Sequence, residues 1–182
     1  MAGKTPAAAI DAYLRPLRQT IRCVCAQHYA YLYRGQPDDS GLYALVLNRG
    51  YPVPLRRQDG RRLLFHVRQQ FRVVEAEIPG SPYKVTTAAY LYGIETPEAS
   101  EVISFHWNPH GLGKVTTPHV HLGPAVVHPD ALARDLHIPT GRVSLESVVR
   151  FLITELGVIP QLPDWEDMLL HNEELFNLWR TW

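Results

Sequence analysis

Residues 63–78 read LLFHVRQQFRVVEAEI and carry the clearest strand pattern of this chain. Side chains two residues apart in a strand point to the same face of the sheet, so the alternation predicts one apolar and one polar face. The apolar face comprises Phe65, Val67, Phe71 and Val73. The polar face comprises His66, Arg68, Gln70 and Arg72. A strand here would therefore display histidine and arginine side chains in a row.

Further strands are expected on both sides of this segment, because short apolar alternations recur between turn-forming residues. They are residues 43–47 (YALVL), 83–92 (YKVTTAAYLY), 101–107 (EVISFHW) and 119–122 (HVHL). Consecutive strands with short links favour neighbouring antiparallel positions. The sequence therefore predicts an antiparallel meander of about four to five strands within residues 43–122.

Both ends of the chain show helical periodicity instead. Near the N-terminus, apolar positions recur about every 3.6 residues, which predicts a helix that Pro16 kinks or interrupts. Ser144 is a suitable N-cap for LESVVRFLITEL, and Gly157 can end that helix in a left-handed conformation. A last helix is expected to start at Asp164.

The predicted fold class is α+β, because a run of strands separates the two helical parts. Its parts are an N-terminal helix within residues 1–34, an antiparallel sheet within 43–122 and a helical C-terminal part within 144–182. All 182 residues are expected to form a single domain, since this length can bury one sizeable core.

Composition places the chain among globular proteins, with 46% hydrophobic and 20% charged residues. No apolar run approaches the roughly eighteen residues of a membrane span, and Asp11 and Arg15 break the N-terminal alanine stretch, so no signal peptide is expected. Cys23 and Cys25 are expected to be free thiols, because two cysteines alone cannot close a structural zinc site. These features predict a cytoplasmic protein without a membrane partner.

The charges divide along the chain although their sum is zero. Residues 1–84 carry most of the Lys and Arg, and residues 85–182 carry most of the Asp and Glu. This asymmetry is compatible with a basic surface for polyanions, and equally with two halves that attract each other.

Histidine is the residue type whose distribution indicates chemistry. Residues 105–123 read FHWNPHGLGKVTTPHVHLG and hold four of the nine histidines, His106, His110, His119 and His121. His-x-His on one face of a strand is a recurring half-site for zinc, iron or manganese, and His106 on the preceding strand is the natural third ligand. A divalent transition metal is therefore one hypothesis. A purely structural role, with imidazoles packed on the sheet, stays open. The chain could then be a non-catalytic interaction domain whose acidic C-terminal helix contacts a basic partner.

Two known histidine motifs fail at identifiable positions. Residues 113–121 fit the start of the first cupin motif, G-x5-H-x-H, but no glutamate follows His121 at the required distance. Histidine-triad hydrolases carry His-x-His-x-His, and Gly123 stands here where the third histidine should be. Neither family is favoured by the sequence.

The competing hypothesis is metal-free cleavage of RNA. It needs a general base, a general acid and a cation for the phosphorane charge, and histidine serves both proton-transfer roles near neutral pH. The candidate catalytic residues are His106, His119 and His121. The candidate substrate-binding residues are Arg68, Arg72, Lys114, Arg142 and, for base stacking, Trp107. No cofactor is expected under this hypothesis.

The segment 140–142 (TGR) directly precedes the helix that Ser144 caps. Backbone amides at a helix N-terminus can hold a phosphate or a carboxylate, and Arg142 would strengthen such a site. An ordinary capped loop is the competing interpretation. If the anion site exists, His137 and Arg142 belong to it.

An aromatic strand that ends in Trp107-Asn108, a loop, Pro118-His119-x-His121 and then a helix together resemble the TumE-type toxins of bacterial toxin–antitoxin loci. Their usual pattern is a Trp-Asp-Asn segment followed by Pro-His-His-x-His. The resemblance covers about residues 80–155 and implies a growth-inhibiting toxin that acts on RNA and is neutralised by a protein antitoxin. The chain departs from the pattern at Val120, where the family carries histidine, and it is longer at both ends.

Overall fold

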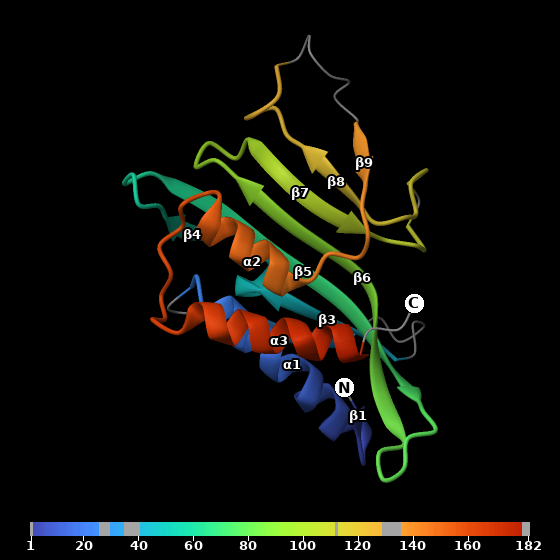
Figure 1. The fold of residues 1–182 in the computed structure, drawn as a ribbon. Helices are drawn as coiled ribbons and strands as arrows, with labels where there is room; N and C mark the ends of the chain where they lie inside the picture. The colour runs from blue at the N-terminus through green and yellow to red at the C-terminus, as the bar shows by residue number, and fades with distance from the viewer. Residues whose placement is uncertain (1, 26–29, 35–40, 112, 129–135, 180–182) are drawn as a thin grey trace.

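Three helices lie on one face of an antiparallel sheet in the computed structural model (Figure 1), which describes residues 2–25, 30–34, 41–111, 113–128 and 136–179. The helices are α1 (Pro6–Arg22), α2 (Leu145–Thr154) and α3 (Trp165–Trp179), with a short 3-10 turn η1 (Asn48–Gly50). The strands are β1 (Ala2–Gly3), β2 (Ala30–Arg34), β3 (Leu42–Leu47), β4 (Val53–Arg56), β5 (Arg62–Glu75), β6 (Tyr83–Glu95), β7 (Glu101–Trp107), β8 (His119–Leu122) and β9 (His137–Pro139).

The strand order within the described residues is β2-β3-β5-β6-β7-β8-β9, with β1 beside β6 and β4 beside β5. All of these pairs are antiparallel, and β5 to β8 form the expected meander. The α+β class is thus confirmed. The sheet has nine strands rather than four to five, because β1, β2, β4 and β9 join it at its edges or ends. Their segments of two to five residues show no clear apolar–polar alternation in the sequence.

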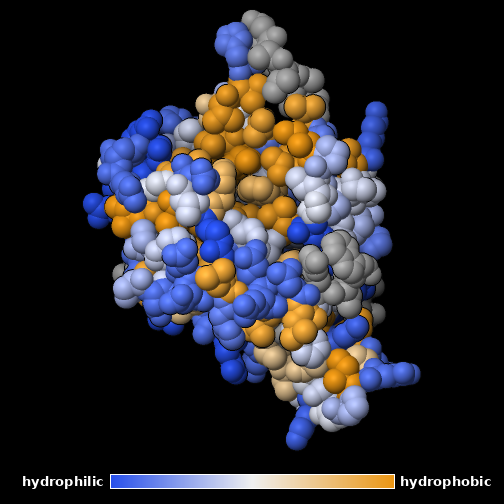
Figure 2. Space-filling model, in the orientation of Figure 1, coloured by the Kyte–Doolittle hydropathy of each residue, from blue (hydrophilic) through white to orange (hydrophobic). Residues whose placement is uncertain are grey.

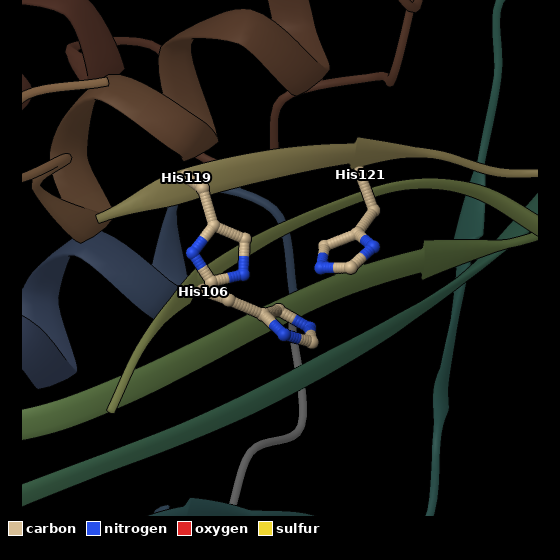
Figure 3. A group of neighbouring side chains, drawn as sticks. All are labelled: His106, His119 and His121. Atoms are coloured by element: carbon tan, nitrogen blue, oxygen red, sulfur yellow. The ribbon is translucent and has the colours of Figure 1, made fainter. Parts of the chain in front are cut away.

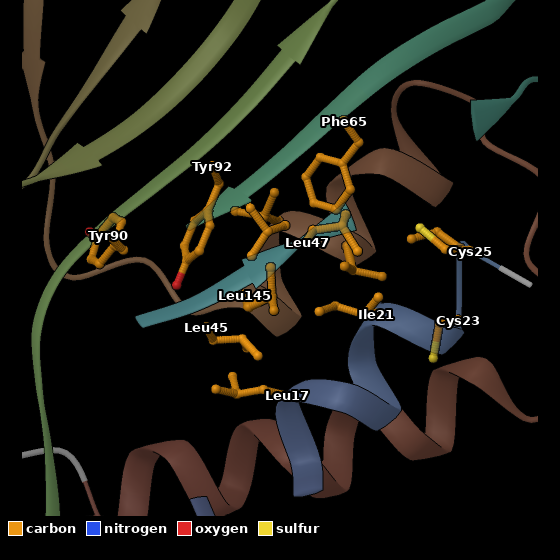
Figure 4. Packing of buried hydrophobic residues seen from close by; sticks show 14 of the residues in the cluster. Leu17, Ile21, Cys23, Cys25, Leu45, Leu47, Phe65, Tyr90, Tyr92 and Leu145 are labelled. Carbon is orange, nitrogen blue, oxygen red and sulfur yellow. The ribbon is translucent and has the colours of Figure 1, made fainter. Parts of the chain in front are cut away.

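The core lies between the helices and the face of the sheet that carries the apolar side chains of β5 (Figure 4). Phe65 of β5 and Ile21 of α1 are fully buried there, and Leu145 of α2 packs in the same layer. Cross-strand neighbours Val67, Tyr92 and Phe105 continue this face across β5, β6 and β7. The alternation in residues 63–78 therefore correctly predicts which side of β5 is covered.

The N-terminal helix is shorter than predicted. α1 ends at Arg22, and the predicted helical residues 30–34 form β2, paired antiparallel with β3; residues 26–29 lie outside the described part. Pairing with an existing strand outweighs the weak helical periodicity of this segment. The expected interruption at Pro16 is also wrong, since α1 runs through that residue.

The other helix boundaries follow the sequence signals. The Ser144 hydroxyl accepts a hydrogen bond from the Ser147 amide at 3.0 Å, and Gly157 adopts a left-handed φ of 66° after α2. α3 starts directly after Asp164. Of the described helices, none is both long enough and apolar enough to cross a membrane.

Surface hydropathy differs between the helices and the sheet that extends beyond them. Figure 2 shows mostly hydrophilic side chains over α1 and α3, with apolar side chains gathered above them toward β7 and β8.

Both cysteines are buried and free, and burial raises the pKa of Cys25 to about 12. A thiol with such a pKa stays protonated at neutral pH and is a poor nucleophile or metal ligand.

Candidate metal centre

Strand register brings the histidines of β7 and β8 together. His106 of β7 lies directly opposite His119 of β8, and Ser104 lies opposite His121. Residues directly opposite in neighbouring strands share a face of the sheet. The intervening residues of both strands, such as Phe105, face the helices, so the three imidazoles lie on the other face of the sheet.

The imidazoles of His106, His119 and His121, called here the three-histidine cluster, turn toward one another (Figure 3). Their ring centroids are 4.7 Å apart for His106 and His121, 4.9 Å for His119 and His121, and 5.5 Å for His106 and His119. One ring nitrogen from each histidine lies within 4.8 Å of the other two. The three imidazoles therefore converge on one face of the sheet rather than pointing to different surfaces.

A fourth imidazole adjoins the cluster. His137 of β9 lies opposite His121, with ring centroids 4.3 Å apart, and its ring is 4.8 Å from that of His119. The sequence placed His137 at a helix-terminus anion site instead, because the three residues of β9 show no alternation.

The remaining described histidines lie outside this group. His66 on β5 pairs with Glu95 of β6 at 3.2 Å between Nε2 and Oε2. His110 and His128 are exposed, and His171 lies on α3. His28 lies outside the described residues.

The orientation of His119 is set by the backbone. Its Nδ1 lies 2.7 Å from the carbonyl oxygen of Thr117, which can only accept a hydrogen bond. Nδ1 therefore carries the proton, and Nε2 keeps its lone pair. Metal-binding histidines are commonly oriented by such a bond from the other ring nitrogen. The side chain is also almost fully buried, which restricts its rotamers.

Electrostatics keep His106 neutral. Burial first, and then the neighbouring His121, His119 and His137, lower the pKa of His106 to about 4, because a further positive charge beside these rings is unfavourable. A neutral imidazole offers a lone pair for a metal, whereas a protonated one does not.

This shift predicts the pH dependence of stability. The folded pKa lies below the ordinary value of 6.5, so between about pH 6.5 and pH 4 the unfolded chain binds more protons. The free energy of unfolding of the metal-free protein should therefore fall by about 1 to 2 kcal/mol across that window, less than the full shift implies because the half-buried ring is partly screened. Urea titrations of wild type and His106→Gln from pH 4 to 8 check this. An equally steep loss in His106→Gln would contradict it.

An open hollow of about 310 Å³ adjoins the cluster on the same face. His106 and His119 line it together with Arg68 of β5. Gln70 and Asn108 add further polar groups. Trp107 and Tyr90 form part of its wall. The hollow is therefore lined by both polar and apolar residues, and Arg68 lines it together with two of the clustered histidines.

The other predicted substrate-binding residues lie elsewhere. Arg72 is further along β5, opposite Thr86 of β6, and Lys114 is exposed in the loop before β8. Neither lines the hollow. The Arg142 guanidinium lies 3.8 Å from the centre of the Trp107 ring and lines a second cavity on the helix side of the sheet. Only Arg68 and Trp107 of the five are therefore brought next to the cluster.

The first turn of α2 does not favour an anion. Ser144 caps it, and the buried carboxyl group of Glu146 occupies the same turn. A carboxyl group at that position already complements the positive end of the helix dipole. The ordinary capped loop is thus the better description of residues 140–144.

Close strand packing explains why the histidine run stops at Gly123. A Cβ atom at this position would overlap the main-chain carbonyl group of Glu101 on the neighbouring strand. A third histidine in the run is therefore sterically excluded by the way β8 leaves β7.

Comparison of the chain with protein-family models, with curated proteins and with solved structures finds no match. The resemblance to TumE-type toxins therefore stays a prediction.

Proposed function

We propose that this protein binds one transition-metal ion, preferably Zn²⁺, through the three-histidine cluster and uses it in hydrolysis of an anionic substrate. The observation that carries the proposal is the convergence of one ring nitrogen each from His106, His119 and His121 within 4.8 Å. Around tetrahedral zinc with Zn–N distances of about 2.0–2.1 Å, ligand nitrogens are about 3.3 Å apart. Small side-chain rotations therefore bring the three nitrogens onto one ion.

Ligand chemistry supports a transition metal over a hard cation. Among the described residues, the cluster consists of imidazoles without a carboxylate. Imidazole suits zinc, copper, iron and nickel, whereas magnesium and calcium prefer oxygen ligands. The bond from His119 Nδ1 to the Thr117 carbonyl leaves Nε2 as the ligand atom. This is the arrangement that raises the basicity of a metal-binding imidazole.

Three protein ligands leave a fourth position for water or substrate, which is the pattern of catalytic rather than structural zinc sites. Zinc lowers the pKa of its bound water to about 7 and so supplies hydroxide at neutral pH. His137 is close enough to the cluster to accept a proton from that water. Arg68 in the adjoining hollow suits a phosphate or carboxylate group of the substrate.

The proposal is tested by metal analysis of protein produced without a tag. About one equivalent of zinc, or of another first-row metal, is expected per chain, and zinc should raise the melting temperature of chelator-treated protein while magnesium should not. Metal at less than one tenth of an equivalent, together with no response to added zinc, would overturn the proposal.

A second candidate is the metal-free cleavage of RNA, as implied by the resemblance to TumE-type toxins. The observation that favours it is Arg68, which lines the same hollow as His106 and His119, so that a base, an acid and a cation adjoin one recess. Trp107 is not expected to stack on a base, because its ring is almost fully buried and lies against the Arg142 guanidinium on the helix side of the sheet.

The two candidates differ in their response to a chelator. Metal-free cleavage predicts that RNA degradation persists in EDTA, and that Arg68→Gln and His119→Ala each lower its rate by about 100-fold. Cleavage that EDTA abolishes and zinc restores would assign the activity to the metal centre. Absence of RNA cleavage with and without metal would remove this second candidate and leave the first intact.

A further inference from the structure

A second group of buried polar side chains lies on the helix side of the sheet, in a core cavity of about 50 Å³. Residues of α1, α2, α3, β5 and β6 line it, so it is separate from the three-histidine cluster on the other face. Figure 4 shows Tyr92 reaching from β6 into this layer between sheet and helices. Buried polar groups are unfavourable in a core unless each finds a partner.

Part of this group is fully hydrogen-bonded. The Tyr13 hydroxyl lies 2.8 Å from the Thr87 hydroxyl and accepts a hydrogen bond from the amide of Gln69. The Tyr92 hydroxyl donates to the carbonyl oxygen of the same Gln69 side chain at 2.6 Å. These residues form a fixed wall of the cavity.

The rest of the group is only half satisfied. Glu146 Oε1 accepts from the Thr20 hydroxyl at 3.0 Å, and Asn172 Nδ2 donates to Thr20 Oγ1 at 3.2 Å and to the Pro16 carbonyl at 3.1 Å. Glu146 Oε2 and Asn172 Oδ1 have no hydrogen-bond partner among the described residues. The two residues are only 2% and 1% exposed, so bulk water does not solvate them.

Burial raises the pKa of the Glu146 carboxyl group, as expected for an acid that is desolvated more strongly than its hydrogen bonds compensate. A core could avoid this arrangement by placing a glutamine or a leucine at residue 146. Buried polar groups without a partner are uncommon in folded proteins and require an explanation, such as a bound ligand, an ion or water.

We propose that the core cavity binds the protonated head of a small primary amine, whose ammonium group donates to Glu146 Oε2 and Asn172 Oδ1. An ammonium group offers three donors and the positive charge that a buried carboxylate requires. The cavity volume suits a compact head group, and Leu175, Phe176 and Trp179 of α3 provide an apolar lining for its carbon chain. Arg142 also lines the cavity, but its guanidinium is stacked on Trp107.

The proposal is tested on the full-length, chelator-treated protein, so that no amine can bind through a metal. Propylamine, 1-propanol and propionate are titrated at pH 8 by calorimetry, because the three share a chain and differ in the head group. Propylamine should bind at one site, and 1-propanol and propionate should bind at least about 10-fold more weakly. A hydrogen bond to a charged acceptor stabilises a complex more than a neutral one does, and the difference corresponds to about 10-fold in affinity.

Glu146→Gln should weaken propylamine binding by about 10-fold or more while leaving the protein folded, because it removes a buried charge and retains an acceptor for Thr20. Glu155→Gln is the matched control, since Glu155 is exposed at the end of the same helix; it should bind propylamine as wild type does. Equal binding of 1-propanol, undiminished binding in Glu146→Gln, or no binding of propylamine would each overturn the proposal. In that case water or a shared proton satisfies the two oxygens.

Discussion

Replacing His119 with alanine is expected to lower zinc affinity by more than about 100-fold, because changes in the hydrogen-bond partners of metal ligands alone cost about 10- to 100-fold. His119 is the best-held member of the cluster, since it is buried and hydrogen-bonded to the Thr117 carbonyl. Competition titration of chelator-treated protein with a fluorescent zinc indicator measures the loss. His121→Ala is expected to act similarly, because its ring centroid lies 4.7 Å from that of His106 and 4.9 Å from that of His119.

His110→Ala is the matched control for that experiment. His110 belongs to the same histidine-rich stretch but is exposed in the loop after β7, outside the cluster. Its replacement should leave zinc affinity unchanged. If His110→Ala and His119→Ala weakened zinc binding equally, the ion would be held by loop histidines and the proposed site would be wrong.

Replacing Gly123 with alanine is expected to lower the free energy of unfolding by about 3 kcal/mol, because a side chain forced into a filled space strains its neighbours. The added Cβ would overlap the main-chain carbonyl group of Glu101, which cannot rotate away as a flexible side chain would. β8 would have to separate from β7, and zinc affinity should fall with stability because His119 and His121 lie on β8. Chemical denaturation measures the first effect and zinc titration the second.

Gly113→Ala provides the comparison. Gly113 lies in the loop before β8, and a Cβ there would meet no atom within 4 Å. Its replacement should change the free energy of unfolding by less than about 0.5 kcal/mol. A stable Gly123→Ala variant with wild-type zinc affinity would show that β8 does not need its close approach to β7.

The central part of the fold could be predicted because it rests on local pattern. The alternation in residues 63–78 identified the covered face of β5, and Ser144 with Gly157 marked the limits of α2. The segment 30–34 was predicted as helix because its strand character depends on pairing with β3, which lies further along the chain. The short strands β1, β4 and β9 show no periodic signal in the sequence. Their strand conformation depends on pairing with neighbouring strands of the sheet.

The candidate site was predictable to the extent that it depends on the alternation of side chains between the two faces of a strand. His119 and His121 share a face whatever the register, and the β7–β8 register then places His106 opposite His119. His137 could not be placed, because the connection into β9 has no regular pattern in the sequence. The acidic Glu146 offered no signal either, since acidic residues in the first turn of a helix are usually solvated. Its burial depends on contacts with α1 and α3, which the sequence pattern does not reveal.

The central claim is that three imidazoles from two neighbouring strands hold one metal ion. Anomalous diffraction at the zinc absorption edge, from crystals of zinc-loaded untagged protein, tests it most directly. The proposal predicts a single peak with the ring nitrogens of His106, His119 and His121 at about 2.0–2.1 Å from the ion. A zinc-loaded crystal with no peak at this cluster, or with a peak held by other residues, would contradict it.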